Sequence, residues 1–440
     1  MTFLPVHQFP AAPQRLLVGV ALLLLVIPGV AAQGAGHSSP APPAAPAESL
    51  YVSGPISQSN RLTRLDPATL ANLPGAALDL SGIVSAAGGT LVVQQTNSPA
   101  GGALVVRDLR TGVVRSRIQS SAMIGYSALS ADGNRLLVIS GQQSAGPGLT
   151  TIPAWTVYDT ATGRQVAAIP DDALGFDVAN VYVFQPDPTL RHLYALVVPE
   201  QDSGKAGPWP ARLVAYDLTT GHVAGRLTLA DVLAGSWPTG AVIHQEPVVQ
   251  DVRPALAISP DGRTLAIVHA DGNAVTLVDA THLRVARTVV LAPRRGLLAR
   301  ILAWLPLFPQ TAEAKLGLNG TVRQAAFSPD GQRLYIYGET GTIKPDGTAD
   351  EHGLGLTVVD LTHGTIEASG LPNIEVDGII LGPDGHDVYA TGMIPVPNAT
   401  TPDLRLWRLD ATSLRVEATR RFAGYRRVLF LPDSVASVAA

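Results

Sequence analysis

Two short turn patterns recur along this chain, and each one makes an apolar segment reverse direction. In the first, an apolar strand ends in aspartate and runs into a turn, as in AVTLVDATHL at residues 274–283. In the second, an apolar strand ends in Ser-Pro-Asp-Gly or a close variant, as at residues 259–262. Proline fixes φ at the start of such a turn, and glycine accepts the positive φ that a tight hairpin needs. The chain is therefore predicted to fold into repeated antiparallel hairpins.

The clearest copy of the repeat begins at residue 255 and predicts one four-stranded antiparallel sheet. We expect a strand that ends at Ser259, a second over residues 264–268, a third that ends at Asp279 and a fourth over residues 284–290. The carboxylate of Asp279 is suited to accept backbone N–H groups in an Asx turn. The aspartates of both patterns are therefore interpreted as structural turn residues.

Both patterns occur seven times, which indicates a repeat architecture. The strands of the first pattern end at Asp66, Asp108, Asp159, Asp217, Asp279, Asp360 and Asp410. The second pattern, in full or degenerate form, lies at residues 85–88, 130–133, 185–188, 259–262, 328–331, 382–385 and 431–433. The first copy of the first pattern, at Asp66, has no copy of the second pattern before it. The last copy of the second pattern, at residues 431–433, has no copy of the first pattern after it. The two orphan halves therefore complete one unit.

A closed ring satisfies both ends of the chain. Pairing residues 428–431 with strands over 50–53 and 61–65 would complete the last unit and remove the exposed sheet edges of an open array. We therefore predict an all-β fold over residues 49–440. It is a seven-bladed β-propeller of four-stranded antiparallel blades, and its last blade is shared between N- and C-terminal strands.

These repeats resemble a known family. Ser-Pro-Asp-Gly, a strand, a gap and then VTLVDATHLRV or LTVVDLTHGTI are similar to the YVTN-type β-propeller repeats, relatives of the WD-repeat propellers that lack the Gly-His and Trp-Asp pairs. The resemblance covers about residues 50–433 and implies a propeller fold. It implies several functions, because such propellers serve as binding proteins, as lactone-cleaving or lyase enzymes, and as subunits of periplasmic dehydrogenases.

The N-terminal segment is interpreted as a targeting sequence. Arg15 precedes an apolar run, and small residues at the end of residues 1–32 suit cleavage before Gln33, so we expect a secretory signal peptide. The alternative is an uncleaved membrane anchor over residues 16–32. Residues 33–48 form a Pro/Ala-rich linker. The expected location is extracytoplasmic, secreted or periplasmic, with tethering to a membrane under the anchor alternative.

Composition excludes some functions. The chain has no cysteine, so it can attach no haem through Cys-x-x-Cys-His and can form no disulfide. The net charge of −4 gives no reason to expect a nucleic-acid partner. We expect a monomer without a bound cofactor, with Ca²⁺ or another divalent cation as the alternative.

Long segments between the second and third strands of the units are expected to emerge on one face as loops. They are residues 141–153, 199–211, 339–353 and 392–403. Polar residues that enter the first strands should line the mouth of the central channel on this face, and arginines there suit a carboxylate or another anion. The alternative is a solvated channel with internal Arg–Asp pairs. The candidate ligand-binding residues are Tyr126, Asn180, Arg253, Arg323, Asp377 and Arg426.

Two acidic groups are candidates for metal or acid–base chemistry. His244 and Glu246 come just before Asp251 in an expected approach loop, and together they could bind a divalent cation or act as acid and base. In the expected loop at residues 344–352, Asp346, Asp350 and Glu351 could ligate Ca²⁺. The alternative for both groups is ordinary polarity of solvated loops.

The longest insertion, at about residues 293–312, is predicted to contain a short basic amphipathic helix. Leucine and isoleucine recur there at helical spacing beside three arginines and Trp304. The apolar stripe of such a helix over residues 294–308 is expected to pack against a neighbouring blade. The alternative is that the helix lies on a membrane or partner surface.

The leading functional hypothesis is a non-enzymatic extracytoplasmic propeller that binds a protein or a small anionic ligand through its long-loop face. Gly125-Tyr126-Ser127 is the nearest approach to a nucleophile elbow, and it misses the second glycine. One alternative is a metal-assisted lactonase or lyase in the channel, with His244, Glu246 and Asp251 as ligands or bases. Another is an accessory subunit of a periplasmic redox complex, with the cofactor supplied by a partner.

Overall fold

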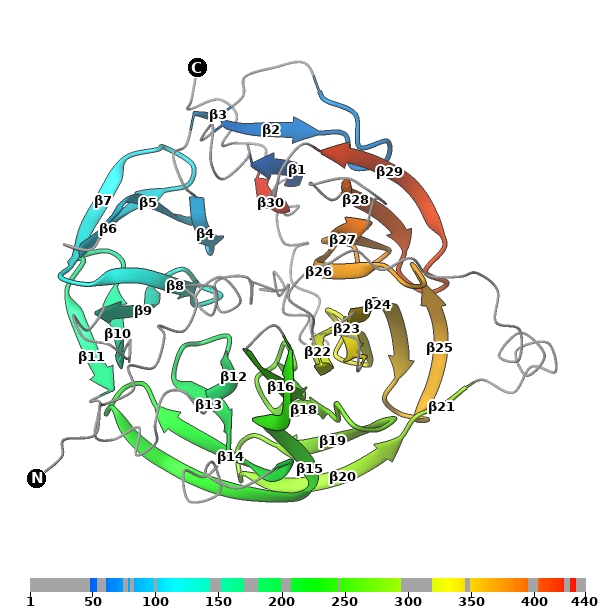
Figure 1. Ribbon diagram of the computed structural model, residues 1–440. Helices are drawn as coiled ribbons and strands as arrows, with labels where there is room; N and C mark the ends of the chain where they lie inside the picture. Colours follow the sequence, from blue (N-terminus) through cyan, green and yellow to red (C-terminus); the bar gives the residue numbers. More distant parts are fainter. Residues whose placement is uncertain are drawn as a thin grey trace, which may run out of the picture.

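All regular elements in the described part of the chain are β-strands, from β1 to β30. The structure is a computed structural model, and Figure 1 shows its sheets arranged in a ring around a common centre. It describes residues 48–53, 61–73, 78–79, 83–98, 101–142, 152–169, 181–198, 207–243, 246–293, 319–344, 349–394, 403–422 and 428–432. The all-β prediction is confirmed.

Four antiparallel four-stranded sheets use consecutive strands of the chain. The first contains β4 (Ile83–Ala87), β5 (Thr90–Ser98), β6 (Gly101–Asp108) and β7 (Val114–Ser120). The second contains β8 (Met123–Leu129), β9 (Arg135–Gln142), β10 (Ile152–Asp159) and β11 (Gln165–Ile169). The third contains β17 (Ala255–Ile258), β18 (Thr264–Val268), β19 (Ala274–Asp279) and β20 (Arg284–Val290). The fourth contains β26 (Glu375–Leu381), β27 (Asp387–Ile394), β28 (Asp403–Asp410) and β29 (Val416–Phe422).

A ten-stranded sheet contains two further four-stranded sets, which are joined through an additional strand, β16 (Glu246–Arg253). The first set is β12 (Val181–Pro186), β13 (His192–Val197), β14 (Trp209–Asp217) and β15 (His222–Ile243). The second is β22 (Asn319–Phe327), β23 (Arg333–Ile343), β24 (Ala349–Asp360) and β25 (Thr365–Gly370). The two-residue strand β21 (Ala292–Pro293) pairs in parallel with the outer edge of β25.

The last sheet joins the two ends of the chain. Its order is β3 (Leu78–Asp79), β2 (Arg61–Leu65), β1 (Glu48–Ser53) and β30 (Val428–Pro432), and β30 pairs antiparallel with β1. Leu50 of β1 is fully buried and lies opposite Phe430 of β30. The predicted closure by a shared sheet is therefore confirmed, and β1 gains a hydrogen-bonded partner on both of its edges.

The turns form as the sequence predicts. In each of the seven aspartates of the first series, Oδ1 accepts at least one backbone N–H two or three residues further on, as from Thr281 and His282 to Asp279. In the second series Ser328 Oγ donates to Asp330 Oδ1 and accepts the backbone N–H of Arg333 at 2.9 Å. These aspartates shape turns, as expected.

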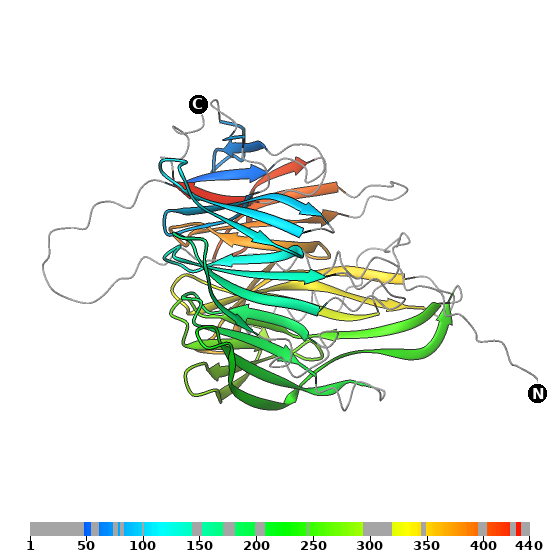
Figure 2. The same cartoon turned by 90° about the vertical axis from the view of Figure 1, so that its left-hand side faces the viewer.

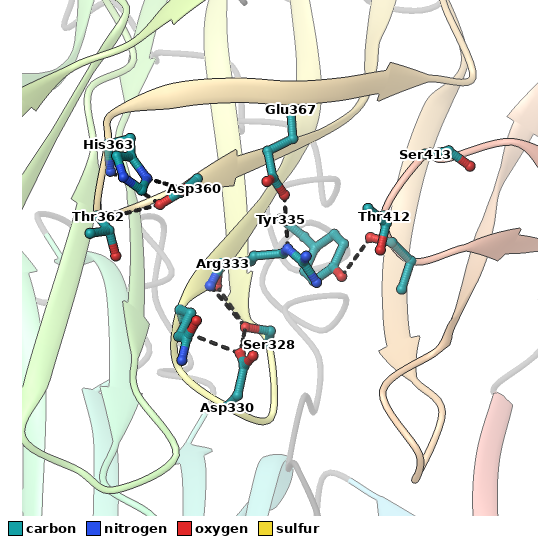
Figure 3. A network of polar contacts seen from close by, with 12 residues as sticks. Ser328, Asp330, Arg333, Tyr335, Asp360, Thr362, His363, Glu367, Thr412 and Ser413 are labelled. Atoms are coloured by element: carbon teal, nitrogen blue, oxygen red, sulfur yellow. Dashed lines mark hydrogen bonds and ion pairs between the residues drawn. The ribbon is translucent and has the colours of Figure 1, made fainter.

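The hydrophobic core lies between neighbouring sheets. Tyr335 and Val358 of one sheet pack in a single cluster with Val388 and Leu409 of the next, and all four are almost fully buried. Figure 3 shows Tyr335 reaching from β23 toward the turn that carries Thr412 and Ser413. Its hydroxyl donates to the backbone carbonyl of Ala411 at 2.9 Å. A side chain of one sheet thus binds the aspartate turn of the next.

Two segments expected as loops are strands instead. The expected loop at residues 339–353 is mostly a ladder, because β23 and β24 stay paired as far as Ile343 opposite Ala349. The expected approach loop before Asp251 is strand β16. Threonine and isoleucine in the first segment have high β-propensity, and the second segment becomes a strand because it pairs with β15 and β22. Among the described residues no helix is long and apolar enough to cross a membrane.

Candidate functional site

The feature that departs most from the regular repeat is a hairpin made by the second half of β15 and by β16. The two strands pair from Gly235 opposite Val252 to Ile243 opposite Glu246. β16 then pairs in parallel with β22, so it adds a strand to the inner edge of that sheet. Figure 2 shows the green and yellow strands of this region extending furthest on one side of the ring. We call β16 and residues 319–323 of β22 the inner edge.

Two tryptophans brace the base of this hairpin. Trp209 of β14 is 6% exposed, and its ring meets the ring of Trp237 edge to face, with 5.7 Å between the centroids. Gly235 makes this contact possible, because its φ is +146° and a Cβ there would lie 2.5 Å from the ring of Trp209. Edge-to-face aromatic pairs add about 0.5–1.5 kcal/mol beyond their buried area. The hairpin is therefore held rigidly where it leaves the ring.

Asp251 and Arg253 lie on one face of β16, since they are two residues apart on a strand. Arg253 Nη2 donates to Asp251 Oδ2 at 2.8 Å. Asp251 Oδ1 and Arg253 Nε are buried and have no hydrogen-bond partner within the described part of the chain. The two residues thus form an ion pair in which one carboxylate oxygen and one guanidinium nitrogen lack a partner among the described residues. The alternative of internal Arg–Asp pairing holds for this pair.

Arg323 lies on β22 with Gly338 of β23 directly opposite. Its Nε is buried and makes no hydrogen bond to any residue that the structure describes. Burial lowers the pKa of Arg323 from its ordinary value, while the charge of Asp271 acts in the opposite direction. Taking a cation out of water without a close partner is unfavourable. The surroundings of Arg323 therefore compensate only part of its charge and hydrogen-bonding capacity.

His269 belongs to the surroundings of Arg323. It is 6% exposed, and its Nε2 lies 2.8 Å from Thr276 Oγ1. Burial lowers the pKa of His269, the carboxylates of Asp271 and Asp231 raise it, and Arg323 lowers it further. His269 and Asp271 come from the end of β18 and the loop that follows it, whereas Arg323 comes from β22 of the neighbouring sheet. Sequence reasoning missed this histidine, because it looked like one more strand-end residue.

Asp377 lies at a β-bulge of β26. The register of β26 against β27 shifts between Val376 and Gly378, so Asp377 is the extra residue. Bulges re-aim a side chain and are frequent near functional sites. The charge of Asp377 and, above all, burial raise the pKa of Tyr337 on the adjacent sheet. Asp377 therefore lies close enough to the β22–β25 set for its charge to act on Tyr337.

Some of the other candidate residues lie in described strands, and others lie outside the described residues. Tyr126 lies on β8 opposite Ile139, and Glu246 is the first residue of β16. Asp350 and Glu351 are consecutive residues of β24, so their side chains leave opposite faces of the sheet. Lys344 Nζ lies 3.9 Å from Asp350 Oδ2. Asn180, His244, Asp346 and Arg426 lie outside the described residues, as does the predicted helix over 294–308.

The described residues place no group of three or more His, Asp or Glu side chains where they could hold a metal ion. The inner edge instead offers guanidinium groups at a sheet edge with unsatisfied donors. Guanidinium groups pair bidentately with carboxylates and phosphates. The chemistry that this arrangement supports is recognition of an anionic group.

A ring of four-stranded antiparallel sheets closed by the pairing of first and last strands defines the chain as a β-propeller. No family model matches the chain, and no curated protein matches it. Among solved structures, it is similar to a chain of the mitotic checkpoint complex at 15% identity, with 92% of this chain and 90% of that chain covered and a TM-score of 0.42.

Two further solved structures match this chain with similar identity, coverage and TM-score. The WD40 domain of Toxoplasma gondii coronin is 11% identical, with 85% and 76% of the two chains covered and a TM-score of 0.43. The β-propeller domain of Cps50 (Swd1) from Myceliophteria thermophila is 12% identical, with 78% and 87% covered and a TM-score of 0.41. The assignment to the propeller class rests on the sheets and closure of this chain itself.

Proposed function

We propose that this protein is a seven-bladed propeller of the YVTN type that acts outside the cytoplasm as a binding scaffold. We further propose that it engages a protein through the β15–β16 hairpin and the adjoining long-loop face. The seven-blade assignment is supported by the five four-stranded sheets and the two four-stranded sets within the ten-stranded sheet. The YVTN assignment and the extracytoplasmic location are supported by the sequence patterns.

The observation that carries the binding proposal is the exposed apolar surface on the braced hairpin. Val242 is 68% exposed and Val249 is 41% exposed. They lie opposite Pro247 and Pro238, respectively. Other exposed valines, such as Val166 and Val416, lie on outer strands of separate sheets. Apolar side chains that are exposed together on a rigid projection are typical of protein-binding surfaces.

Site-specific crosslinking tests this proposal. A photoreactive p-benzoylphenylalanine would replace Val249 in the full chain, in the cells that produce it, and the matched control would replace the equally exposed Val416 of β29. We expect one discrete protein adduct from position 249 and none from position 416. The same adducts at both positions, or none at position 249, would refute binding through the hairpin.

A second variant connects the adduct to the apolar surface. Val242→Asp in the crosslinking protein places a charge beside the proposed contact, and we expect it to reduce the yield of the adduct. The location has its own test, which is N-terminal sequencing of the protein recovered from cell fractions. A chain that begins at Gln33 outside the cytoplasm agrees with the proposal, whereas an intact chain in the cytosol refutes it.

A further inference from the structure

The sheet around Arg323 carries polar side chains on one face in a regular arrangement. Thr321 of β22 lies opposite Thr340 of β23, which lies opposite His352 of β24. Arg323 is two residues from Thr321 on the same strand, so it leaves the same face. The residue opposite Arg323 is Gly338, which has no side chain. The neighbouring strand therefore offers no side chain as a partner for the guanidinium at this position.

Two buried nitrogen atoms of this sheet have no hydrogen-bond partner among the described residues. Thr340 Oγ1 donates to the carbonyl of Gly320 at 2.9 Å and lies 2.9 Å from Thr321 Oγ1, so the threonine hydroxyls satisfy each other and the backbone. Arg323 Nε and His352 Nδ1, by contrast, are buried and have no hydrogen-bond partner in the described part of the chain. Buried polar atoms are nearly always paired, so those that are not need an explanation such as a ligand.

The charges that surround Arg323 leave it partly uncompensated. No carboxylate of the described residues lies within ion-pair distance of it, although ion pairs are found for Arg253, Arg333 and other arginines. Asp271 is the acidic residue that acts on it, and it does so from an exposed position in the loop after β18. A ligand carboxylate would supply the missing partner and would match the planar guanidinium.

We infer that Arg323, on the inner edge of the ring, is the binding site for a carboxylate. This inference rests on the proposed binding function and names the chemistry of its ligand. The carboxylate belongs either to an acidic segment of a protein partner or to a small organic acid. Both sources present the same group to the guanidinium, and the experiment separates them.

Thermal unfolding of the full chain with defined probes tests the inference. The probes are succinate and a decapeptide of glutamate with blocked ends, and the uncharged controls are succinamide and the corresponding glutamine peptide. We expect a charged probe to stabilise the wild type, and Arg323→Gln to weaken its binding by about tenfold or more. Arg323→Lys keeps the positive charge but loses the two parallel N–H donors of the guanidinium, so it should retain part of the binding. Stabilisation by the peptide alone identifies a protein segment, and stabilisation by succinate identifies a small acid.

The same variant tests the ligand role without any probe. If Arg323 serves to bind a ligand, the ligand-free Arg323→Gln variant should be at least as stable as the wild type, because it lacks an unsatisfied buried cation. The control Arg284→Gln removes an exposed cation that is paired with Asp279. Three results overturn the inference: loss of stability in free Arg323→Gln, equal stabilisation of Arg323→Gln and wild type by a charged probe, and no stabilisation of the wild type by either charged probe.

A spectroscopic reading adds independent support. Arg323 lowers the pKa of His269, so a carboxylate bound to Arg323 should raise the pKa of His269 toward its ordinary value. NMR titration of histidine-labelled protein, with His269→Gln to assign the signal, measures this shift. An unchanged pKa of His269 at saturating probe places the probe elsewhere and overturns the site. A crosslinked partner without any carboxylate effect would leave the proposed function standing and discard this inference alone.

Discussion

The hydroxyl of Tyr389 donates a hydrogen bond to the backbone carbonyl of Pro67 at 3.1 Å, although 322 residues separate them in the sequence. Pro67 directly follows Asp66, the first aspartate of the repeated turns. Tyr194 and Tyr335 make the same contact with Ala280 and Ala411, which follow aspartates in the turns of their neighbouring sheets. The aspartate turn therefore has two roles: it ends a hairpin, and it presents a carbonyl to the preceding sheet.

Tyr389→Phe should destabilise the ring at the point where its ends meet. The variant removes a part-buried hydrogen bond, and we expect a loss of about 0.5–1.5 kcal/mol in the free energy of unfolding. Urea unfolding followed by tryptophan fluorescence measures it. Tyr335→Phe, which removes the equivalent bond between two consecutive sheets, is the matched comparison. An unchanged midpoint in Tyr389→Phe would show that this bond contributes nothing to closure.

Deleting residues 428–440 should destabilise the whole propeller. The deletion removes β30 and exposes the inner edge of β1, including Leu50, to water. Deleting residues 433–440 is the control, because it keeps β30 (Val428–Pro432). We expect calorimetry to show a large fall in the melting temperature for the longer deletion and little change for the shorter one. Equal melting of the longer deletion and the full chain would contradict closure by β30.

The turn between β12 and β13 should make stability depend on pH through His192. The pKa of His192 is raised from its ordinary value of 6.5, chiefly by its hydrogen bond to Asp187, with 3.1 Å between Nδ1 and Oδ2. A raised histidine pKa stabilises the folded state at pH values below 6.5, and this contribution is lost as the pH rises through the folded-state pKa. Urea unfolding at pH 6 and pH 9 should show the difference, and His192→Gln should lack it.

Asp187 of the same turn should contribute stability in the opposite direction. Burial raises its pKa, but hydrogen bonds from His192, Arg191 and Thr189 outweigh burial and lower the pKa below 3.8. Its contribution is present above that value and is lost as the pH falls through the folded-state pKa. Asp187→Asn should cost about 1–3 kcal/mol at pH 6, because the buried amide cannot replace every accepted bond. A variant as stable as the wild type at pH 6 would contradict this account.

Divalent cations should leave the melting temperature unchanged. Asp350 and Glu351 leave opposite faces of β24, so a cation on one face of the sheet cannot use both carboxylates. A thermal-shift series with Ca²⁺, Mg²⁺ and Zn²⁺, together with metal analysis of the purified protein, measures this. A stoichiometric metal that is lost in Asp350→Asn or Glu246→Gln would contradict this prediction and support a metal site.

Trp237→Leu should loosen the β15–β16 hairpin and leave the ring folded. The change removes the edge-to-face contact with Trp209 and keeps an apolar side chain, so we expect a loss of about 0.5–1.5 kcal/mol. Hydrogen exchange of the β16 amides should become faster, while exchange in β17–β20 stays the same. Uniformly faster exchange would show that Trp237 supports the whole fold instead.

Local chemistry in the sequence was enough to predict the repeats and the closure. Aspartate, serine and glycine in the turns act on backbone groups only a few residues away, so the strands from Ala255 to Val290 and their turns follow from the sequence alone. The unmatched half-units at the two ends predicted the pairing of β30 with β1, because an open sheet edge needs a partner.

Only the tertiary structure decided where the chain departs from the repeat and which charges meet. Residues 246–253 look like a polar loop, and they become a strand because β15 and β22 each offer an edge. Arg323, His269 and Asp271 come from two neighbouring sheets, and nothing in their sequence spacing brings them together. Whether a charge is buried, paired or left without a partner depends on such long-range packing, and sequence patterns of a few residues do not contain it.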